Sequence, residues 1–411
     1  MKSIIAILLF LLTGSAAFAQ NNQLNYYVTR ALASSPLLKD YQNQIQSGVY
    51  DSLLILAAYR PQFAGSGLAS YAPVAKGWGY DAAITNGQVL NALVGVSQQL
   101  PNKKNLKVQF ESIQLQNQSI SNTSRLTEQD LRRNITAQYI TAYGSLHQLN
   151  FNKEISRLLS NEEIILKKLT QANVYKQVDY LAFLVTLQQQ NLLVKQSSIQ
   201  YKNDVATLNY LSGINDTSAV ELQEPAIILQ ALPEINNAGF FKQFEIDSLK
   251  LNNSKALVDI AYKPKFNLFA DAGYYSSLTV KPYKNIGTSF GVSAVIPLYK
   301  GNQKKLEYSK IAILERTRRN NKAFFTSQHT QLVAQLYQQL HGTEELITDI
   351  NNQLKYSQSL IDVNKKLLET GDVKITDFIL ALNNYINAKN QVAQNTISRL
   401  QIINQLNYWN R

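Results

Sequence analysis

The chain repeats one unit of about 200 residues, and this duplication constrains its fold more than any other feature. The stretch GVSAVIPLYKGNQKKL, Gly291 to Leu306, is echoed by GVSQQLPNKKNL, Gly95 to Leu106, which aligns Pro297 on Pro101. Two more pairs of segments align at nearly the same separation: Tyr262–Phe266 with Tyr59–Phe63, and Lys366–Phe378 with Lys168–Tyr180. The same elements are therefore expected twice, in the same order.

Each copy is predicted to contain a helix, a β-hairpin, a very long helix, a turn and a returning helix. The first copy spans 20–214 and the second 239–411, with a linker at 215–238. The first contains a helix at 24–58 broken at Ser35-Pro36, a hairpin at about 63–100, a long helix at about 102–170, a tip turn at about 171–178 and a return helix at about 179–212. The second contains a helix at 240–262, a hairpin at about 266–296, a long helix at about 302–369, a tip turn at about 370–376 and a return helix at about 377–409.

The hairpin of the second copy alternates apolar with small or polar residues. Phe266, Leu268, Ala270, Ala272 and Tyr274 share one face of its first strand, and Ile286, Phe290, Val292, Ala294 and Ile296 share one face of its second. The turn KPYKN joins the two strands. Strands of about 10 residues with one apolar face suit a barrel in a bilayer. On alternation alone, a half-buried hairpin in a soluble domain fits equally well.

The long helices contain no proline and almost no glycine. Each would be roughly 100 Å long at about 1.5 Å per residue, which points to a coiled or tubular assembly. Apolar residues recur every seven positions in both copies. They are Val333, Leu340, Ile347, Leu354, Ile361 and Leu368 on the second long helix, and Val178, Val185, Leu192, Ile199 and Ala206 on the first return helix. This period predicts supercoiled packing against neighbouring helices.

The N-terminus predicts export. Lys2, an apolar run at 4–12 and Ala17-Phe18-Ala19 form a signal peptide, residues 1–19, whose apolar part is too short to span a bilayer. The chain has no cysteine, which excludes disulfides, a thiolate site and a lipid-anchored cysteine. No later segment has the apolar length of a transmembrane helix. The net charge of +12 is interpreted as a solvated basic surface, and nucleic acid is not an expected partner of an exported chain.

The combination of these elements narrows the fold. Four amphipathic strands cannot close a barrel, and lipid does not tolerate an open sheet edge. The strands are therefore expected to join a barrel shared between chains, in which three copies supply twelve strands and the attached helices form a matching tube.

With these elements in this order, the sequence resembles the TolC-like outer-membrane efflux proteins over nearly the whole mature chain, from Leu24 to about Tyr408. The segments that carry the resemblance are Ala31-Leu32 with Ser35-Pro36-Leu37, LNYLSG from Leu208, VIPLYKGNQKK from Val295 and TGDVKITDFILA from Thr370. The resemblance implies a homotrimer with a twelve-stranded barrel in the outer membrane and a periplasmic α-barrel of antiparallel helical hairpins. It also implies a periplasmic adaptor and an inner-membrane pump of the RND, ABC or MFS type as partners, beside outer-membrane lipids.

The resemblance assigns roles to the two tip turns. Adaptor docking is expected at Asn173, Val174, Gly371, Asp372 and Val373. Acidic residues just after the turn are expected to ring the closed end of the tunnel, and Asp377 and Asp179 hold that position. The next acidic position of the family is Leu380 here. Gly371 is also expected to end its helix, and Asn173 in place of glycine should weaken the first turn.

The junction of strand and helix supplies candidate membrane-interface residues. Lysines follow both prolines and could reach anionic headgroups, or could simply be solvated. The candidates are Lys103, Lys104, Lys304 and Lys305, together with the aromatic residues Tyr71, Trp78, Tyr274, Tyr283 and Tyr299.

No arrangement of residues predicts catalysis, a cofactor or a metal site. His341 and Glu344 have ligand spacing but no further partner. Two readings remain. The first is a passive outer-membrane export duct with a periplasmic extension. The second is a periplasmic coiled-coil structural or adaptor protein whose hairpins are soluble.

Overall fold

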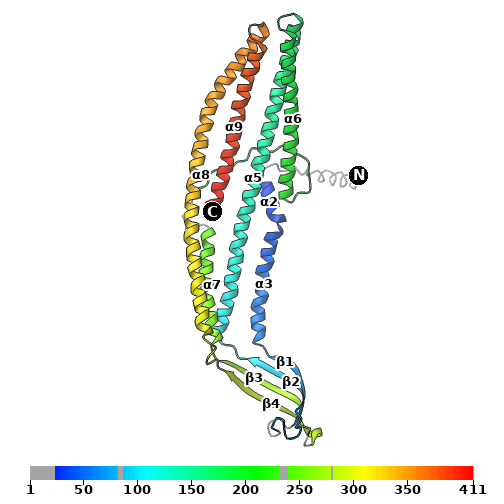
Figure 1. Ribbon diagram of the computed structural model, residues 1–411, viewed down its shortest axis with the longest axis vertical. Helices are drawn as coiled ribbons and strands as arrows, with labels where there is room; N and C mark the ends of the chain where they lie inside the picture. The colour runs from blue at the N-terminus through cyan, green and yellow to red at the C-terminus, as the bar shows by residue number, and fades with distance from the viewer. Residues whose placement is uncertain (1–23, 82–86, 232–238, 279–280, 411) are drawn as a thin grey trace, which may run out of the picture. The chain divides into compact units, whose positions relative to one another are not determined.

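Long helices and one four-stranded sheet make up the computed structural model, which describes residues 24–81, 87–231, 239–278 and 281–410 (Figure 1). In chain order the elements are α2 (Leu24–Ser34), α3 (Pro36–Ala58), β1 (Gln62–Tyr71), β2 (Gln88–Gln99), α5 (Lys103–Gln171), α6 (Gln177–Leu211), α7 (Gly239–Ala261), β3 (Lys265–Ser276), the short 3₁₀ helix η2 (Pro282–Lys284), β4 (Ile286–Val295), α8 (Gln303–Thr370) and α9 (Ile375–Trp409). The expected signal peptide, 1–19, and the end of the expected linker, 232–238, lie outside the described residues.

The predicted fold class, mainly helical with four strands, is confirmed. The helix break at Ser35-Pro36 is also confirmed, because α2 ends at Ser34 and α3 begins at Pro36. Proline fits the first turn of a helix, where its missing N–H is not needed. In the described ranges, no helix combines the length and the apolar composition that crossing a membrane requires.

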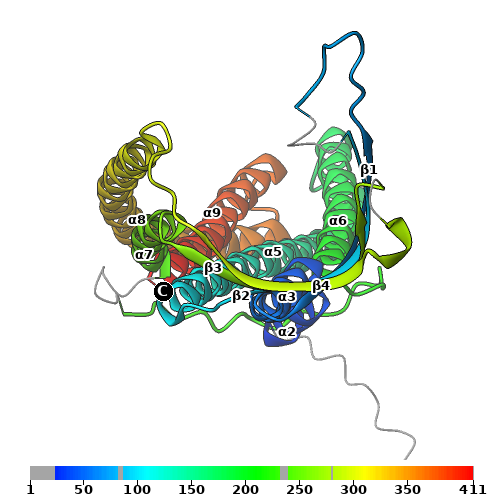
Figure 2. The same cartoon turned by 90° about the horizontal axis from the view of Figure 1, so that it is seen from below.

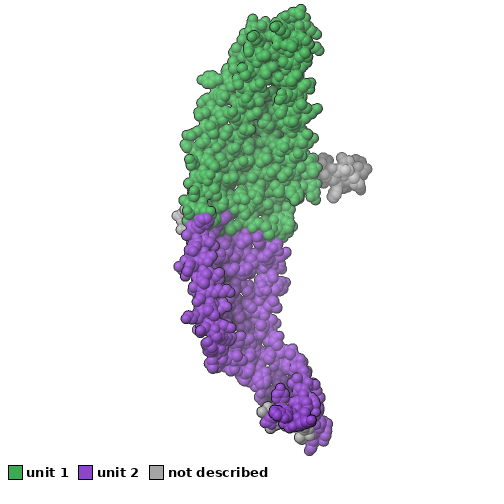
Figure 3. All heavy atoms as spheres, viewed as in Figure 1, with its two compact units in different colours: residues 1–39, 125–239, 325–411 green, residues 40–124, 240–324 purple. Residues whose placement is uncertain are grey.

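The chain divides into two compact units, and neither corresponds to one sequence repeat (Figure 3). Unit 1 contains residues 1–39, 125–239 and 325–411, and unit 2 contains 40–124 and 240–324. Each unit therefore combines segments of both repeats, and helices α5 and α8 each contribute to both units.

Unit 2 contains the sheet, in which all neighbours are antiparallel and the order is β1-β2-β3-β4 (Figure 2). Leu268 is opposite Val292 and Ala270 is opposite Phe290, so the predicted apolar positions of β3 and β4 share one face. The register extends this face to Val94 and Val96 of β2. The sheet thus has one face rich in aliphatic and aromatic residues, and a second face that carries most of the serine and asparagine residues.

The helices of unit 2 are joined by polar contacts. The amide of Asn253 in α7 donates to the carbonyl of Val108 in α5 at 3.0 Å, and Arg318 in α8 donates to the carbonyl of Phe244 in α7 at 3.1 Å. Helix α3 approaches α5 closely at Gly48, where an added Cβ would lie 2.4 Å from the Oδ1 atom of Asn117. Small and polar residues therefore set the spacing of these helices.

The core of unit 1 is a bundle of α5, α6, α8 and α9. Its buried members are Phe151, Ile155, Leu159 and Leu166 of α5, Phe183 and Leu187 of α6, Ile361 and Leu368 of α8, and Ile375, Phe378, Ala381, Leu382 and Tyr385 of α9. A second cluster joins α2 to α5 and α6, and it includes Leu222 of the linker. A third joins α8 to α9.

The heptad predictions have different outcomes on the two helices. On α8, Val333, Leu340, Ile361 and Leu368 are buried, as a coiled-coil seam requires. On α6 the predicted packing is not found within the described chain, because Val178, Val185, Leu192 and Ile199 are 58–69% exposed. Helix α6 instead buries Phe183, Leu187 and Gln190. Most of the α6 heptad is therefore left uncovered by the described residues of one chain.

Candidate functional site

Both tip turns end a long helix in the same way. In the first, the N–H of Val174 donates to the carbonyl of Leu169 and that of Asn173 to Thr170. In the second, Asp372 donates to Leu367 and Gly371 to Leu368. These paired bonds define a Schellman motif, which requires a left-handed residue just past the helix.

The left-handed positions are Asn173, with φ of 62°, and Gly371, with φ of 84°. The predicted helix-ending role of Gly371 is therefore confirmed. Asn173 makes the same pair of bonds, so the first turn has the same hydrogen-bond geometry as the second, and the weakening expected from asparagine stays a prediction. Asparagine tolerates this conformation better than other residues with a side chain.

The return helices begin two residues earlier than predicted, at Gln177 and Ile375. Lys176 and Lys374 precede them in extended conformation and make no side-chain cap, so Asp179 and Asp377 lie in the first turn instead. A carboxylate there interacts favourably with the positive end of the helix dipole. Asp377 and Leu380 are exposed, and Asp179 is half-buried.

One side chain ties the two tip turns together. The hydroxyl of Tyr175 lies 2.9 Å from the carbonyl oxygen of Leu368 and 3.0 Å from that of Val373, where its single proton is shared. Burial raises the pKa of Tyr175. An added Cβ at Gly371 would lie 2.7 Å from Cγ1 of Val174, so the side chain of Val174 also lies against the backbone of the second turn. Asn173, Val174 and Asp372 remain exposed and open to a partner.

An ion pair behind the tip was not predicted. Glu162 of α5 is fully buried, and its carboxylate lies 3.0 Å from Nζ of Lys365 on α8. This contact raises the pKa of Lys365. Glu162 occupies a heptad core position of α5, in series with the buried residues Ile155, Leu159 and Leu166. A charged residue at such a core position is the sequence feature from which the ion pair could have been predicted.

A side-chain hydrogen bond joins α6 to α5 in the same region. The hydroxyl of Tyr180 on α6 donates to the carboxylate of Glu163 on α5, and this bond raises the pKa of Tyr180 to about 12. The two adjacent glutamates of α5 thus bind different helices: Glu162 contacts α8, and Glu163 contacts α6.

The strand–helix junctions of unit 2 hold the other candidates. Lys304 pairs with Asp259 of α7 at 2.7 Å, and this bond, with one from Tyr308, lowers the pKa of Asp259. Lys103, Lys104 and Lys305 are exposed. Tyr299 is 77% exposed beside a hollow of about 580 Å³, and Tyr274 lies half-buried on the apolar face of the sheet.

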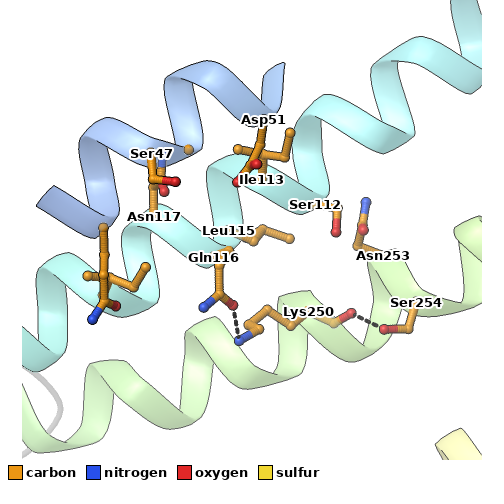
Figure 4. A pocket seen from close by; sticks show the side chains of 13 residues that line it. Ser47, Asp51, Ser112, Ile113, Leu115, Gln116, Asn117, Lys250, Asn253 and Ser254 are labelled. Atoms are coloured by element: carbon orange, nitrogen blue, oxygen red, sulfur yellow. Dashed lines mark hydrogen bonds between the residues drawn. The ribbon is translucent and has the colours of Figure 1, made fainter. Parts of the chain in front are cut away.

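A polar groove of about 460 Å³ lies between α3, α5 and α7 of unit 2. Figure 4 shows Ser47 and Asp51 on α3 at one side and Lys250 on α7 at the other, with Nζ of Lys250 bound to Oε1 of Gln116 at 2.8 Å. The groove has no nucleophile paired with a base. Elsewhere, Glu344 binds Arg399 at 2.7 Å rather than His341, which faces Glu345. No group of three metal-ligating side chains occurs in the part of the chain that the structure describes.

No protein-family model matches the chain, and no curated protein matches it in sequence. Solved structures do match its fold. They include the outer membrane protein VceC of Vibrio cholerae, with 10% identity, a TM-score of 0.74 and coverage of 94% of this chain and 96% of that one. CusC, which forms a transmembrane channel, has 14% identity, a TM-score of 0.74 and coverage of 94% of this chain and 92% of that one. The outer membrane channel MtrE of Neisseria gonorrhoeae has 11% identity, a TM-score of 0.72 and coverage of 94% and 88%.

The chain has the same fold as these outer-membrane proteins. Within it, the predicted site residues form two groups. The tip group, Asn173, Val174, Asp179, Gly371, Asp372, Val373 and Asp377, belongs to unit 1, and the junction group, Lys103, Lys104, Tyr274, Tyr299, Lys304 and Lys305, belongs to unit 2. Sequence reasoning missed Tyr175 and the pair Glu162–Lys365, which join the tip group to its supporting helices.

Proposed function

We propose that three copies of this chain form an outer-membrane export duct, a passive water-filled path for substrates that an inner-membrane pump and a periplasmic adaptor deliver. The pump is of the RND, ABC or MFS type. The observation that carries the proposal is the open four-stranded sheet with one apolar face. Such a face suits lipid, and an enzyme would need a reactive site that the described residues do not supply.

The sheet order supports closure by identical copies. Strands β1 and β4 are the two ends of the described sheet. Because four strands alternate in direction, β4 of one copy runs antiparallel to β1 of the next, and the pattern continues around a ring. An unpaired backbone edge is costly in lipid, so closure removes the main penalty of inserting the sheet. The TolC-like resemblance sets the number of copies at three, which makes twelve strands.

The exposed stripes of unit 1 support the same ring. Helix α6 exposes Val178, Leu181, Val185, Leu192 and Ile199, and α8 exposes Tyr356, Leu360, Val363 and Leu367. Each helix also has a buried stripe within its own chain. We propose that α6 of one copy packs against α8 of the next. Contacts between two different surfaces, repeated by rotation, give a closed ring.

The proposed roles of the two site groups follow from this assembly. The tip turns dock the adaptor through Asn173, Val174 and Asp372, while Asp377 and Asp179 from three copies narrow the tunnel. The lysines and tyrosines of the junction group contact the lipid headgroups of the outer membrane. The chain reaches that membrane by export, during which residues 1–19 are removed.

The test is the state of the full-length protein in the outer membrane of its host. We expect a band of trimer size in unheated electrophoresis that becomes a monomer on heating, and ion conductance in planar bilayers. Val185→Asp with Leu192→Asp should weaken the trimer band, whereas Ser160→Asp, an exposed position on α5, should not. Recovery of the wild type as a soluble periplasmic monomer would overturn the proposal and favour the coiled-coil structural or adaptor role.

A further inference from the structure

The described strands carry two charged side chains, and both lie on the same face of the sheet. They are Lys265 at the start of β3 and Asp271 six residues later. Side chains of a strand alternate, so an even separation places both on the face opposite the apolar one. Across the strand pairs, Asp271 is opposite Gly95 of β2 and Ser289 of β4. A carboxylate therefore lies near the middle of β3 with small neighbours on both sides.

The carboxylate of Asp271 is held in place. The hydroxyl of Ser289 donates to its Oδ2 atom at 2.6 Å. The surrounding face carries hydroxyl and amide side chains, among them Asn91, Ser97, Asn267 and Ser293. A charge on this face avoids lipid if the apolar face contacts the membrane, and it then points into the space that the closed sheet surrounds.

We infer that Asp271 is a residue that sets the ion selectivity of the strand-lined part of the channel. The inference rests on the proposed function, because three copies are needed to arrange three carboxylates in one ring. A ring of carboxylates attracts cations and repels anions in a pore. Lys265 lies about 20 Å away at about 3.4 Å per residue, beyond the screening length of about 8 Å at physiological salt, so it does not neutralise this ring.

The experiment compares the potassium-to-chloride permeability ratio of wild-type and variant channels, from reversal potentials in a potassium chloride gradient across a planar bilayer. For Asp271→Asn we expect the cation preference to fall toward a ratio of one. Asp271→Glu, which keeps the charge, should retain the cation preference of the wild type. Ser289→Ala, which removes the hydrogen bond and keeps the charge, should retain most of the preference, and Lys265→Gln should leave it unchanged or increase it.

The outcomes separate this inference from the proposed function. If the wild type forms no channel, the proposed function fails. If the wild type conducts and Asp271→Asn has the wild-type ratio, the selectivity role is wrong while the duct remains. An equal loss in Ser289→Ala and Asp271→Asn would also overturn it, because the loss would then follow the local structure of the strands and not the charge.

Discussion

At the residue scale, a few side chains decide how the tip turns are built. Gly371 and Asn173 both end a helix in the left-handed conformation, and Gly371 also lies against Val174 of the opposite turn. Tyr175 and the pair Glu162–Lys365 then join the first helical hairpin to the second. The stability of the tip therefore depends on both hairpins together.

Gly371→Ala should destabilise the tip by about 1–2 kcal/mol, because alanine is strained at positive φ and its Cβ would contact Val174. Gly342→Ala is the matched control. Gly342 lies inside α8 with nothing near the position of an added Cβ, so alanine there should stabilise by about 0.5–1 kcal/mol. Thermal unfolding of the purified protein in detergent measures both. A lower midpoint for both variants would contradict the role given to φ at Gly371.

Lys365→Met should cost about 1–3 kcal/mol, because it leaves the buried carboxylate of Glu162 without its partner. The double variant Glu162→Leu with Lys365→Met should recover most of this loss, since an apolar residue fits the heptad core. Lys366→Met, at an exposed neighbouring position, should change little. A double variant less stable than Lys365→Met alone would contradict this prediction, because leucine would then fit position 162 worse than the unpaired glutamate does.

At the element scale, the long helices are held by polar contacts at intervals as well as by apolar seams. In unit 2, Glu315 binds Arg318 and Arg319 on the same helix, and Arg318 reaches the carbonyl of Phe244 on α7. The ion pairs, with Arg318 contributing most, lower the pKa of Glu315 from 4.5 to about 2. One carboxylate thus holds in place the arginine that joins α8 to α7.

This lowered pKa predicts how stability depends on pH. A depressed pKa in the folded state stabilises the protein fully above the unfolded value of 4.5, and the contribution is lost as the pH falls toward about 2. Glu315→Gln should therefore lower the unfolding midpoint at pH 7, and the difference from wild type should shrink between pH 5 and pH 2. The measurement is thermal unfolding across that range. A difference that stays constant with pH would mean that packing, not ionisation, is what the variant changes.

At the scale of the whole molecule, the exposed stripes of α6 and α8 and the two sheet edges are surfaces that one chain leaves uncovered. An assembly of identical copies also brings equivalent residues together that are single in one chain. Asp377 illustrates the point, since it is exposed in the single chain and would face its equivalents in the proposed trimer. Three carboxylates in a narrow ring repel each other and attract cations.

Asp377→Ala should raise the single-channel conductance or alter the ion selectivity in planar bilayers, because it removes that ring. Asp372→Ala is the control at the same tip, since Asp372 lies outside the helix and its carboxylate accepts a bond from Thr370. An unchanged conductance and selectivity for Asp377→Ala would leave Asp377 as a residue of the first helical turn only. Equal effects of both variants would point to the net charge of the tip.

Periodic features were accessible from the sequence, because each follows from local geometry. Alternation along Phe266–Tyr274 predicted the strand and its apolar face, and the lack of proline predicted the long helices. The break at Ser35-Pro36 and the turn at Gly371 follow from backbone sterics. These properties depend on neighbours in the chain, so the sequence by itself determined them.

Partners across the fold were decided only by the tertiary structure. The heptads of α6 and α8 look alike in sequence, but α8 buries its seam within the chain whereas α6 exposes Val178 and Val185 and buries Phe183. The contact of Tyr175 with Val373 and that of Glu162 with Lys365 join residues about 200 positions apart. A heptad repeat indicates that a helix has an apolar side, but only the packing of all the helices determines which surface covers that side.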